Sequence, residues 1–188
     1  MSECADIAVA ILAAGRARRF GSDKLMAPLN GLPVGLHIAR SIADMNFGWR
    51  FAICAADAPI AEHYVSAGFD VIINSDPDQG QARSLHLAVQ AAELTKATAL
   101  LVLLADMPFI TRAHLDAITG NTVLCASTDG NTPMPPALFP RSMWPDLLLA
   151  HGDRGARHLL RGAHLVKAPA AILWDIDVEA DLHTPGIS

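Results

Sequence analysis

The sequence predicts an α/β fold in which one domain, expected to span 1–188, is built on a doubly wound, mostly parallel β-sheet. Short apolar runs alternate with stretches of helical periodicity almost from the first residue, and this spacing is typical of parallel strands joined by helical crossovers. The length of 188 residues fits a single domain with a sizeable core. With 52% hydrophobic and 18% charged residues, the composition excludes intrinsic disorder.

The first two thirds of the chain carry the clearest alternation. An apolar run over 7–12 leads to Gly15, as expected for a strand that is buried on both faces and followed by a glycine turn. Pro33 begins an amphipathic stretch that reaches Met45 and predicts a helix. The same reasoning predicts the remaining elements of this region: strands at 51–54, 71–73 and 100–104, and helices after Asp57, over 82–94 and over 111–120.

The rhythm changes after a strand predicted at 123–126. The segment 128–136 collects turn formers and prolines and therefore predicts a loop. Beyond it we expect a helix over 142–150, another helix after Arg157, and short strands around Val166 and Ile172. No linker-like stretch separates these elements from the rest, so they are expected to extend the same sheet.

Composition and patterning exclude several classes of protein. The longest apolar runs, 7–14 and 99–105, are far shorter than the roughly 18 residues of a membrane-spanning helix. The first residues are acidic and lack the pattern of a secretory signal, so a cytoplasmic location is expected. The net charge of −5 argues against a nucleic-acid-binding surface.

Cysteine and histidine positions show no metal-binding spacing. There are three widely separated cysteines and no C-x-x-C pair, so we expect buried, unbridged side chains at Cys4, Cys54 and Cys125. The eight histidines form no H-E-x-x-H pattern, and His37 and His86 lie on predicted apolar helix faces, where a structural role is expected.

In a parallel sheet, ligands bind beyond the carboxyl ends of the strands, so we examined the residues that follow each strand. The first predicted strand leads into a loop with two glycines, Gly15 and Gly21, and four basic residues, which are Arg16, Arg18, Arg19 and Lys24. Such a loop can hold phosphate oxygens through backbone N–H groups and cations. The spacing is neither a P-loop nor G-x-G-x-x-G, and the alternative is a solvated basic loop.

Three further strand ends carry polar residues. Asp106 ends the most apolar strand, where a carboxylate could bind Mg²⁺ or cap a turn. The stretch 74–84 joins a strand to a helix, which suits a nucleotide or an ordinary capped turn. Asp175 and Asp177 alternate with Ile176 on a predicted terminal strand, so both carboxylates would face one side, as metal ligands or as a strand edge.

Taken in order, these segments resemble a known family. The pattern Leu12-Ala-Ala-Gly-x-x-x-Arg19-x-Gly21-x-x-Lys24 resembles the signature of the MobA-like nucleotidyltransferases, and Ala14 is similar to the molybdenum cofactor cytidylyltransferase branch rather than the guanylyltransferase branch. The later segments that resemble the family's other motifs are Asn74 with Gly80 and Ser84-Leu85, then 104–108, 152–157 and 175–177. The resemblance covers residues 7 to about 181.

The resemblance implies a sheet of the nucleotide-diphospho-sugar transferase type and a reaction. CMP would pass from CTP to the terminal phosphate of molybdopterin, with release of pyrophosphate and with Mg²⁺ as cofactor. Arg19 would bind the departing phosphates and Lys24 the α-phosphate, while Asp106 and Asp177 would bind Mg²⁺. The nucleotide would also contact Leu12, Ala13, Ala14, Gly15, Asn74, Gly80 and Ser84. A molybdoenzyme that receives the product is a possible protein partner.

The chain also departs from the family pattern. Val178-Glu-Ala-Asp181 follows Asp177 where the family usually has Thr-Pro-Glu-Asp, and 134–136 reads Met-Pro-Pro where the branch commonly has Gly-His-Pro. The alternatives are transfer of GMP or another nucleotide, transfer to another phosphorylated acceptor, and a non-catalytic carrier of the cofactor or a nucleotide. A Rossmann dehydrogenase is disfavoured because the dinucleotide fingerprint is missing.

Overall fold

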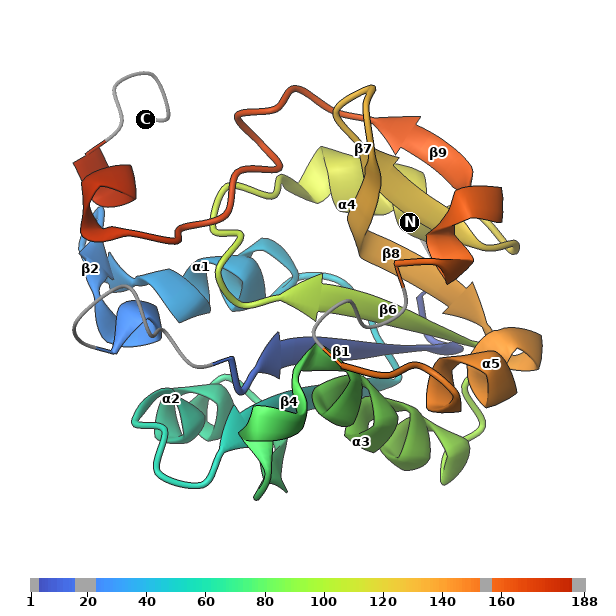
Figure 1. Cartoon of the computed structure of the whole chain (residues 1–188), viewed down its shortest axis with the longest axis horizontal. Coiled ribbons are helices and arrows are strands. Elements are labelled where there is room, and N and C mark those ends of the chain that lie inside the picture. The colour runs from blue at the N-terminus through green and yellow to red at the C-terminus, as the bar shows by residue number, and fades with distance from the viewer. Residues whose placement is uncertain (1–3, 16–22, 153–156, 184–188) are drawn as a thin grey trace.

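The computed structural model describes residues 4–15, 23–152 and 157–183 and has the predicted α/β architecture (Figure 1). Its central sheet has the order β5-β4-β1-β6-β8-β7-β9. Among the described strands of this sheet, β8 alone runs antiparallel to its neighbours, so the mostly parallel, doubly wound sheet is confirmed. The strand bounds are β1 (Ile7–Ala13), β4 (Trp49–Ala55), β5 (Asp70–Asn74), β6 (Ala99–Leu104), β7 (Cys125–Thr128), β8 (Pro133–Pro140) and β9 (His164–Lys167).

Strand β1 shows why a continuous apolar run forms the middle of this sheet. All seven of its residues are buried, and it pairs in parallel with β4 on one side and β6 on the other. Ile7, Val9 and Ile11 pack into one hydrophobic cluster, while Ala8 and Ala10 pack into a second. Because successive side chains of a strand point to opposite faces, both faces of the sheet must be covered.

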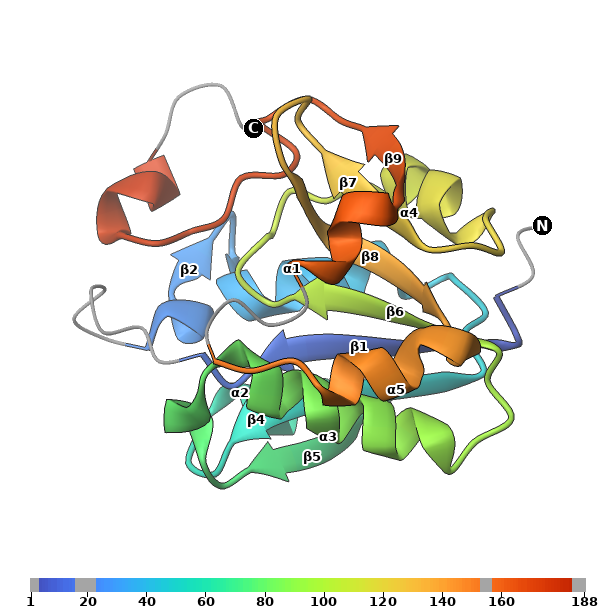
Figure 2. The ribbon, with the colours of Figure 1, turned by 45° about the vertical axis from the view of Figure 1, so that its right-hand side comes forward.

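Two groups of helices cover these faces. Ile38, Tyr64 and Leu115 place α1 (Val34–Ser41), α2 (Ile60–Ser66) and α4 (Arg112–Thr119) in the first cluster. Leu85 and Trp144 place α3 (Gln81–Glu93) and α5 (Trp144–Leu148) in the second. Figure 2 shows α3 and α5 together in front of the sheet. The two covered faces explain the dense alternation of apolar positions in the sequence.

The predicted helix over 34–45 is too long at its end. It stops at Ser41, and the next residues form turns in which Ala43 N–H donates to Arg40 O and Met45 N–H donates to Ile42 O. Ile42 and Met45 are nevertheless fully buried. A turn packed on the core therefore produced the apolar spacing that predicted a longer helix.

The prediction of a loop over 128–136 is wrong in its second part. Strand β8 begins at Pro133, and its regular pairing with β6 starts at Ala137 opposite Val102. The prolines before Ala137 lie where the register with β7 shifts, so few ladder N–H groups are needed there. Strand β7 starts at Cys125, two residues later than predicted.

The last segments also differ from the prediction. Residues around Ile172 form a turn, in which Leu173 N–H donates to Ala170 O, and the two aspartates 175 and 177 lie on irregular extended chain rather than on a strand. The helix predicted over 142–150 is α5 preceded by η3 (Arg141–Met143), and the one predicted after Arg157 is η4 (Leu159–Gly162). The remaining short elements are η1 (Lys24–Met26), β2 (Pro28–Leu29), β3 (Leu32–Pro33), η2 (Pro77–Gln79) and η5 (Glu179–His183).

The cysteines and the two singled-out histidines have the predicted structural roles. Cys4, Cys54 and Cys125 are buried and unbridged, and burial raises the pKa of the Cys54 thiol to about 12. The imidazole Nε2 atoms of His37 and His86 are hydrogen-bonded to backbone carbonyls of Leu29 and Ala150. No helix in the described parts of the chain combines the length and the apolarity needed to cross a membrane.

Candidate active site

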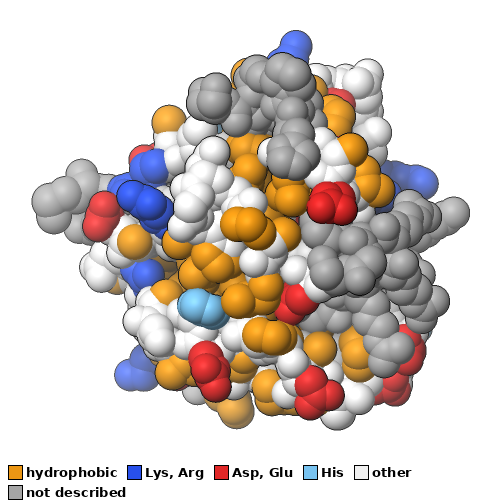
Figure 3. Space-filling view, turned by 90° about the vertical axis from the view of Figure 1, so that its left-hand side faces the viewer, with side chains coloured by type: hydrophobic (Ala, Val, Ile, Leu, Met, Phe, Trp, Pro, Cys, Tyr) orange, Lys and Arg blue, Asp and Glu red, His pale blue; other side chains and the backbone are white. Residues whose placement is uncertain are grey.

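A cavity of about 580 Å³ opens at the carboxyl ends of β1 and β6. These adjacent strands end in register, with Leu12 opposite Leu104, and Ala105 N–H donates to Leu12 O just beyond them. The residues that follow both strands therefore meet at one place. Figure 3 views the molecule from this edge and shows hydrophobic side chains at its centre with acidic side chains around them. The volume lies in the range of sites that enclose a small ligand.

Most of the predicted site residues line this cavity. From β1 and its end come Leu12, Ala13, Ala14 and Gly15, and the other predicted residues on the wall are Lys24, Gly80, Ser84, Asp106 and Asp177. Arg19 lies outside the described residues. Asn74 lines a neighbouring hollow of about 540 Å³ instead, which shares Gly15 and Lys24 with the cavity. Chain segments more than 150 residues apart in sequence thus converge as predicted.

Lys24 lies at the centre of the charged part of the wall. It begins η1, where Asp23 caps the turn by accepting a hydrogen bond from Leu25 N–H. Its Nζ lies 2.9 Å from Asp106 Oδ2 and 3.6 Å from Asp177 Oδ1. The Lys24 side chain is only 13% exposed, against 60% for Asp177. One ammonium group therefore faces two carboxylates, one from the middle of the chain and one from near its C-terminus.

A third carboxylate, Asp175, lines the same cavity. Its pKa is raised by desolvation and by the negative charges of Asp177 and Asp106, while Lys24 acts in the opposite direction. These oxygens are hard donors of the kind that Mg²⁺ prefers, and Mg²⁺ is commonly held by one or two carboxylates together with substrate phosphates. Among the described residues, however, no three or more His, Cys, Asp or Glu side chains are grouped so that they could hold a metal ion by themselves. The site fits a divalent cation whose coordination a phosphate completes.

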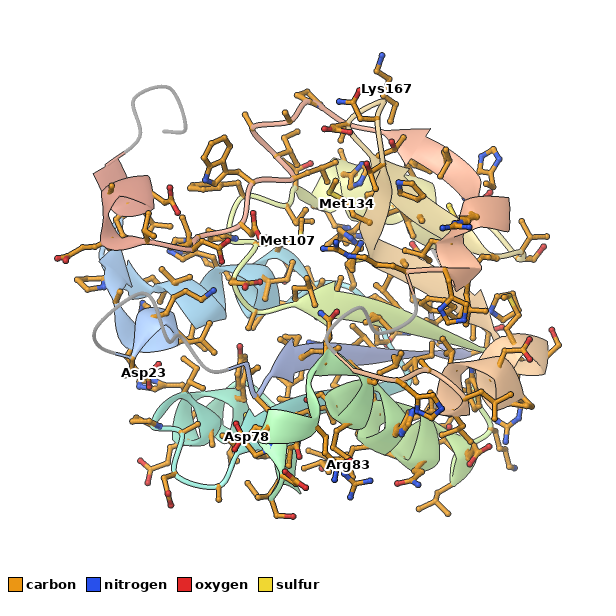
Figure 4. The ribbon with its side chains drawn as sticks, in the orientation of Figure 1. Asp23, Asp78, Arg83, Met107, Met134 and Lys167 are labelled. Carbon is orange, nitrogen blue, oxygen red and sulfur yellow. The ribbon has the colours of Figure 1, made fainter. Side chains whose placement is uncertain are left out.

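The segment 77–84 forms another part of the cavity wall, and Asn74 lies just before it. Gly80 has a φ of 79°, in the left-handed region, where the chain passes from η2 into α3. The buried Asn74 side chain donates to Ser84 Oγ at 3.0 Å and accepts from Asp76 N–H. Asn74 thus holds the turn and the start of α3, and the backbone around Gly80 and Ser84 faces the cavity. Figure 4 shows Asp78 in this turn and Met107 after β6.

Among the wall residues to which the family resemblance assigned no role are Gln81, Arg157 and Asp175. Gln81 directly follows Gly80, and the other two lie inside segments that had been singled out, 152–157 and 175–177. Their positions were therefore visible in the sequence. The orientation of Arg157 and Asp175 was not, because it depends on how the chain after β8 returns to the cavity.

Fold and site together define a class of protein. A doubly wound sheet whose strand ends place a lysine and aspartates around one cavity is the arrangement of an enzyme that binds a phosphorylated ligand. The chain belongs to the MobA-like NTP transferase domain family, which it matches over residues 9–168. It is accordingly a nucleotidyltransferase.

The chain is similar in sequence or in fold to several known proteins. It is similar to the purine catabolism protein PucB of Bacillus subtilis, with 26% identity over 93% of this chain and 90% of that protein. A probable molybdenum cofactor guanylyltransferase of Pyrococcus horikoshii is 31% identical over 58% of this chain and 53% of that protein. A solved nucleotidyl transferase from Methanothermobacter, 22% identical, has the same fold with a TM-score of 0.79 over 93% of each chain.

Proposed function

We propose that the protein transfers CMP from CTP to the terminal phosphate of molybdopterin and releases pyrophosphate, with Mg²⁺ bound by Asp106 and Asp177. The observation that carries the proposal is the position of the Lys24 ammonium, at 2.9 and 3.6 Å from these carboxylates on the wall of the cavity. A cation and a pair of carboxylates at one point are what a transferred phosphoryl group and its metal ion require.

The transfer is a substitution at the α-phosphorus. An oxygen of the acceptor phosphate forms a bond to this phosphorus, the bond to the bridging oxygen breaks, and pyrophosphate leaves with the electron pair. The acceptor phosphate is already anionic at neutral pH, so no side chain has to remove a proton. Lys24 would neutralise the charge that shifts across the α-phosphate, and Arg19 would bind the departing pyrophosphate.

Two carboxylates support the choice of a hard divalent cation. Bound there, Mg²⁺ would draw negative charge from the phosphate oxygens. Asp106 and Asp177 would hold it, and the nearby Asp175 carboxylate adds negative charge to the same wall. The Lys24 ammonium faces the oxygens of Asp106 and Asp177 and offsets part of their negative charge.

The nucleotide would lie along the backbone of 12–15 and the turn at Gly80. Ala14 lines the cavity and supports a pyrimidine, because a methyl group directed at the base would leave less room for a purine than glycine would. Asn74, which does not reach this cavity, would act by holding Ser84 at 3.0 Å. Backbone groups would thus make most of the contacts that recognise the cytosine and the ribose.

The name of the Pyrococcus relative supports one alternative, transfer of GMP. A non-catalytic carrier is less well supported, because a carrier has no need for an ammonium group placed between two carboxylates. A molybdoenzyme that accepts the product remains part of the proposal as a partner of the reaction, although no surface is assigned to it.

One experiment separates these functions. The protein would be incubated with Mg²⁺, molybdopterin-type cofactor and each of the four α-labelled nucleoside triphosphates in turn. We expect label from CTP in the dinucleotide product with an equal amount of pyrophosphate. Transfer from GTP instead would establish guanylyl transfer, and tight nucleotide binding without pyrophosphate release would establish the carrier. A sample without the acceptor is the control for simple hydrolysis.

A further inference from the structure

We propose that Ile176 is a positioning residue that docks the segment 173–183, named here the C-terminal strap, and so places Asp177 beside Lys24 and Asp106. The inference rests on the proposed function in one respect, that these carboxylates bind the divalent cation. The strap lies beyond residues 9–168, which match the family.

The Ile176 side chain is fully buried in a small hydrophobic cluster of its own. Its buried partners are Ala27, Leu29 and Val34, from the segment that follows Lys24, and Phe109 and Leu182 pack against their edge. The two large clusters that cover the sheet do not contain these residues. Leu173, at the start of the strap, packs in the first large cluster, whereas docking of the strap from Ile176 onward is separable from formation of the main core.

The backbone of Ile176 makes a second connection. Its N–H donates to Asp106 O at 2.9 Å, which links the strap to the chain that carries the strand-end carboxylate. Because the chain is extended here, the residues on either side of Ile176 point the opposite way, and Asp175 and Asp177 line the cavity. One residue thus contacts both the Lys24 segment and the Asp106 segment, and it carries Asp177 between them.

Asp181 completes the arrangement. Its Oδ2 accepts hydrogen bonds from Asp177 N–H at 2.8 Å and Val178 N–H at 2.9 Å, which holds the backbone of Asp177. The departure from Thr-Pro-Glu-Asp at 178–180 leaves this last aspartate in place. Asp181 thereby acts on the backbone, while Asp177 turns its carboxylate to Lys24.

The predicted consequence is a loss of cation affinity without a loss of fold. Removing the Ile176 side chain should release the strap and leave Asp106 and Lys24 in place, because these two are held by the sheet and by η1. Asp177 would then sample many positions, and more divalent cation would be needed to occupy the site. Changes in residues that support metal ligands typically cost 10–100-fold in metal affinity.

The test compares Ile176→Ala with Ile176→Val and with Ile118→Ala. The first removes the anchor and the second restores most of it. Ile118→Ala removes the same atoms from the main core at α4, where Ile118 is fully buried. Asp181→Ala is a further variant that opens no cavity in the core. Circular dichroism of each variant establishes that it is folded.

Three quantities are measured: amide hydrogen exchange of 174–182 without ligand, Mn²⁺ binding in the presence of a non-hydrolysable CTP analogue, and the Mg²⁺ concentration for half-maximal transfer. For Ile176→Ala we expect faster exchange in the strap and roughly 10-fold weaker Mn²⁺ binding, with a matching rise in the Mg²⁺ requirement. In Ile176→Val, the exchange rate of the strap and the Mn²⁺ affinity should return most of the way to the wild-type values. Asp181→Ala should weaken Mn²⁺ binding less than Ile176→Ala does, and Ile118→Ala should leave cation binding unchanged.

Unchanged exchange in Ile176→Ala would overturn the anchoring role, and faster exchange with unchanged Mn²⁺ binding would overturn the positioning role. An equal loss of Mn²⁺ binding in Ile118→Ala would reduce the effect to general destabilisation and also overturn it. The exchange measurement needs no substrate. If the wild-type protein transferred no nucleotide but bound Mn²⁺ through a docked strap, the proposed function would fail and the anchor would stand.

Discussion

Two halves of the site reach the cavity by different routes. Ala14 directly follows β1 and Asp106 comes two residues after the end of β6, so the register of two adjacent buried strands fixes their separation. Asp175 and Asp177 arrive on irregular chain held by one small cluster around Ile176. The strand-end half is a consequence of forming the core, whereas the C-terminal half needs contacts of its own. Substitutions should therefore be tolerated less well in the strand-end half, named here the rigid half, than in the C-terminal half, named here the adjustable half.

The largest effect is expected from Asp106→Asn, because this carboxylate belongs to the rigid half and is 26% exposed. The change keeps the side-chain volume and removes the charge that would bind Mg²⁺. We expect a loss of the order of 10³-fold in kcat, near the upper end for one preorganised electrostatic group. Calorimetric titration of Mg²⁺ with nucleotide present is the measurement, and Asp116→Asn in α4 is the control. Undiminished Mg²⁺ binding would contradict the assignment.

Lys24 contacts both halves, so its removal tests their connection. Lys24→Ala should lower kcat by about 10²-fold or more while KM for the nucleotide changes little, because the ammonium is needed most as the bond to pyrophosphate breaks. Steady-state kinetics with varied nucleotide provide the measurement, and Lys96→Ala at an exposed position is the control. A raised KM with an unchanged kcat would show that Lys24 only binds the ground state.

Asp177→Asn should show how much weaker the adjustable half is. Its side chain is 60% exposed and lies 3.6 Å from Lys24 Nζ, so water screens its charge more than that of Asp106. We expect the rate of transfer at low Mg²⁺ concentration to fall about 10-fold, which is in the range for charged groups on the edge of a metal site. The assay is the Mg²⁺ dependence of transfer. A loss as large as that of Asp106→Asn would mean that the two halves are equally important.

The two halves also differ in how far the sequence predicted them. The strands over 7–12 and 100–104 could be located from their apolar runs, because burial on both faces leaves few other interpretations, and their ends identified Ala14 and Asp106. The chain after 123 was predicted less well. The prolines before Ala137 looked like a loop although they enter β8, and the spacing of Asp175 and Asp177 looked like a strand although a single buried isoleucine produces it. Contacts between distant segments decide these features, and local patterns do not contain them.

A finer test within the rigid half is the choice of nucleotide. If the Ala14 methyl group restricts the base pocket, Ala14→Gly should raise kcat/KM for GTP relative to CTP by about 5- to 10-fold, since a group of methyl size is worth about 1–3 kcal/mol. Competition between the two nucleotides in one reaction gives the ratio directly, so the activity of the variant itself cancels. An unchanged ratio would place base selection elsewhere on the wall, while the transfer chemistry would be unaffected.

The smallest effect is expected outside both halves of the site, at His114 on α4. Its Nε2 is hydrogen-bonded to Ser127 Oγ at 2.8 Å, and Ser127 Oγ donates to Pro136 O, which ties α4 to β7 and β8. Burial lowers the pKa of His114, so the unfolded chain takes up a proton on this histidine at higher pH than the folded protein does.

The stability that depends on neutral His114 is therefore fully present above its unfolded pKa of 6.5 and falls as the pH decreases below that value. In His114→Gln, which keeps a donor for Ser127 but cannot titrate, the free energy of unfolding should decrease less between pH 7.5 and pH 5.5. The difference from wild type cannot exceed about 1.4 kcal/mol for each pH unit, the limit for one proton. Urea denaturation at the two pH values measures it, and His63→Gln on α2 controls for the loss of a histidine elsewhere. If wild type and His114→Gln lost equal stability, the contact of α4 with β7 and β8 would not depend on a neutral imidazole.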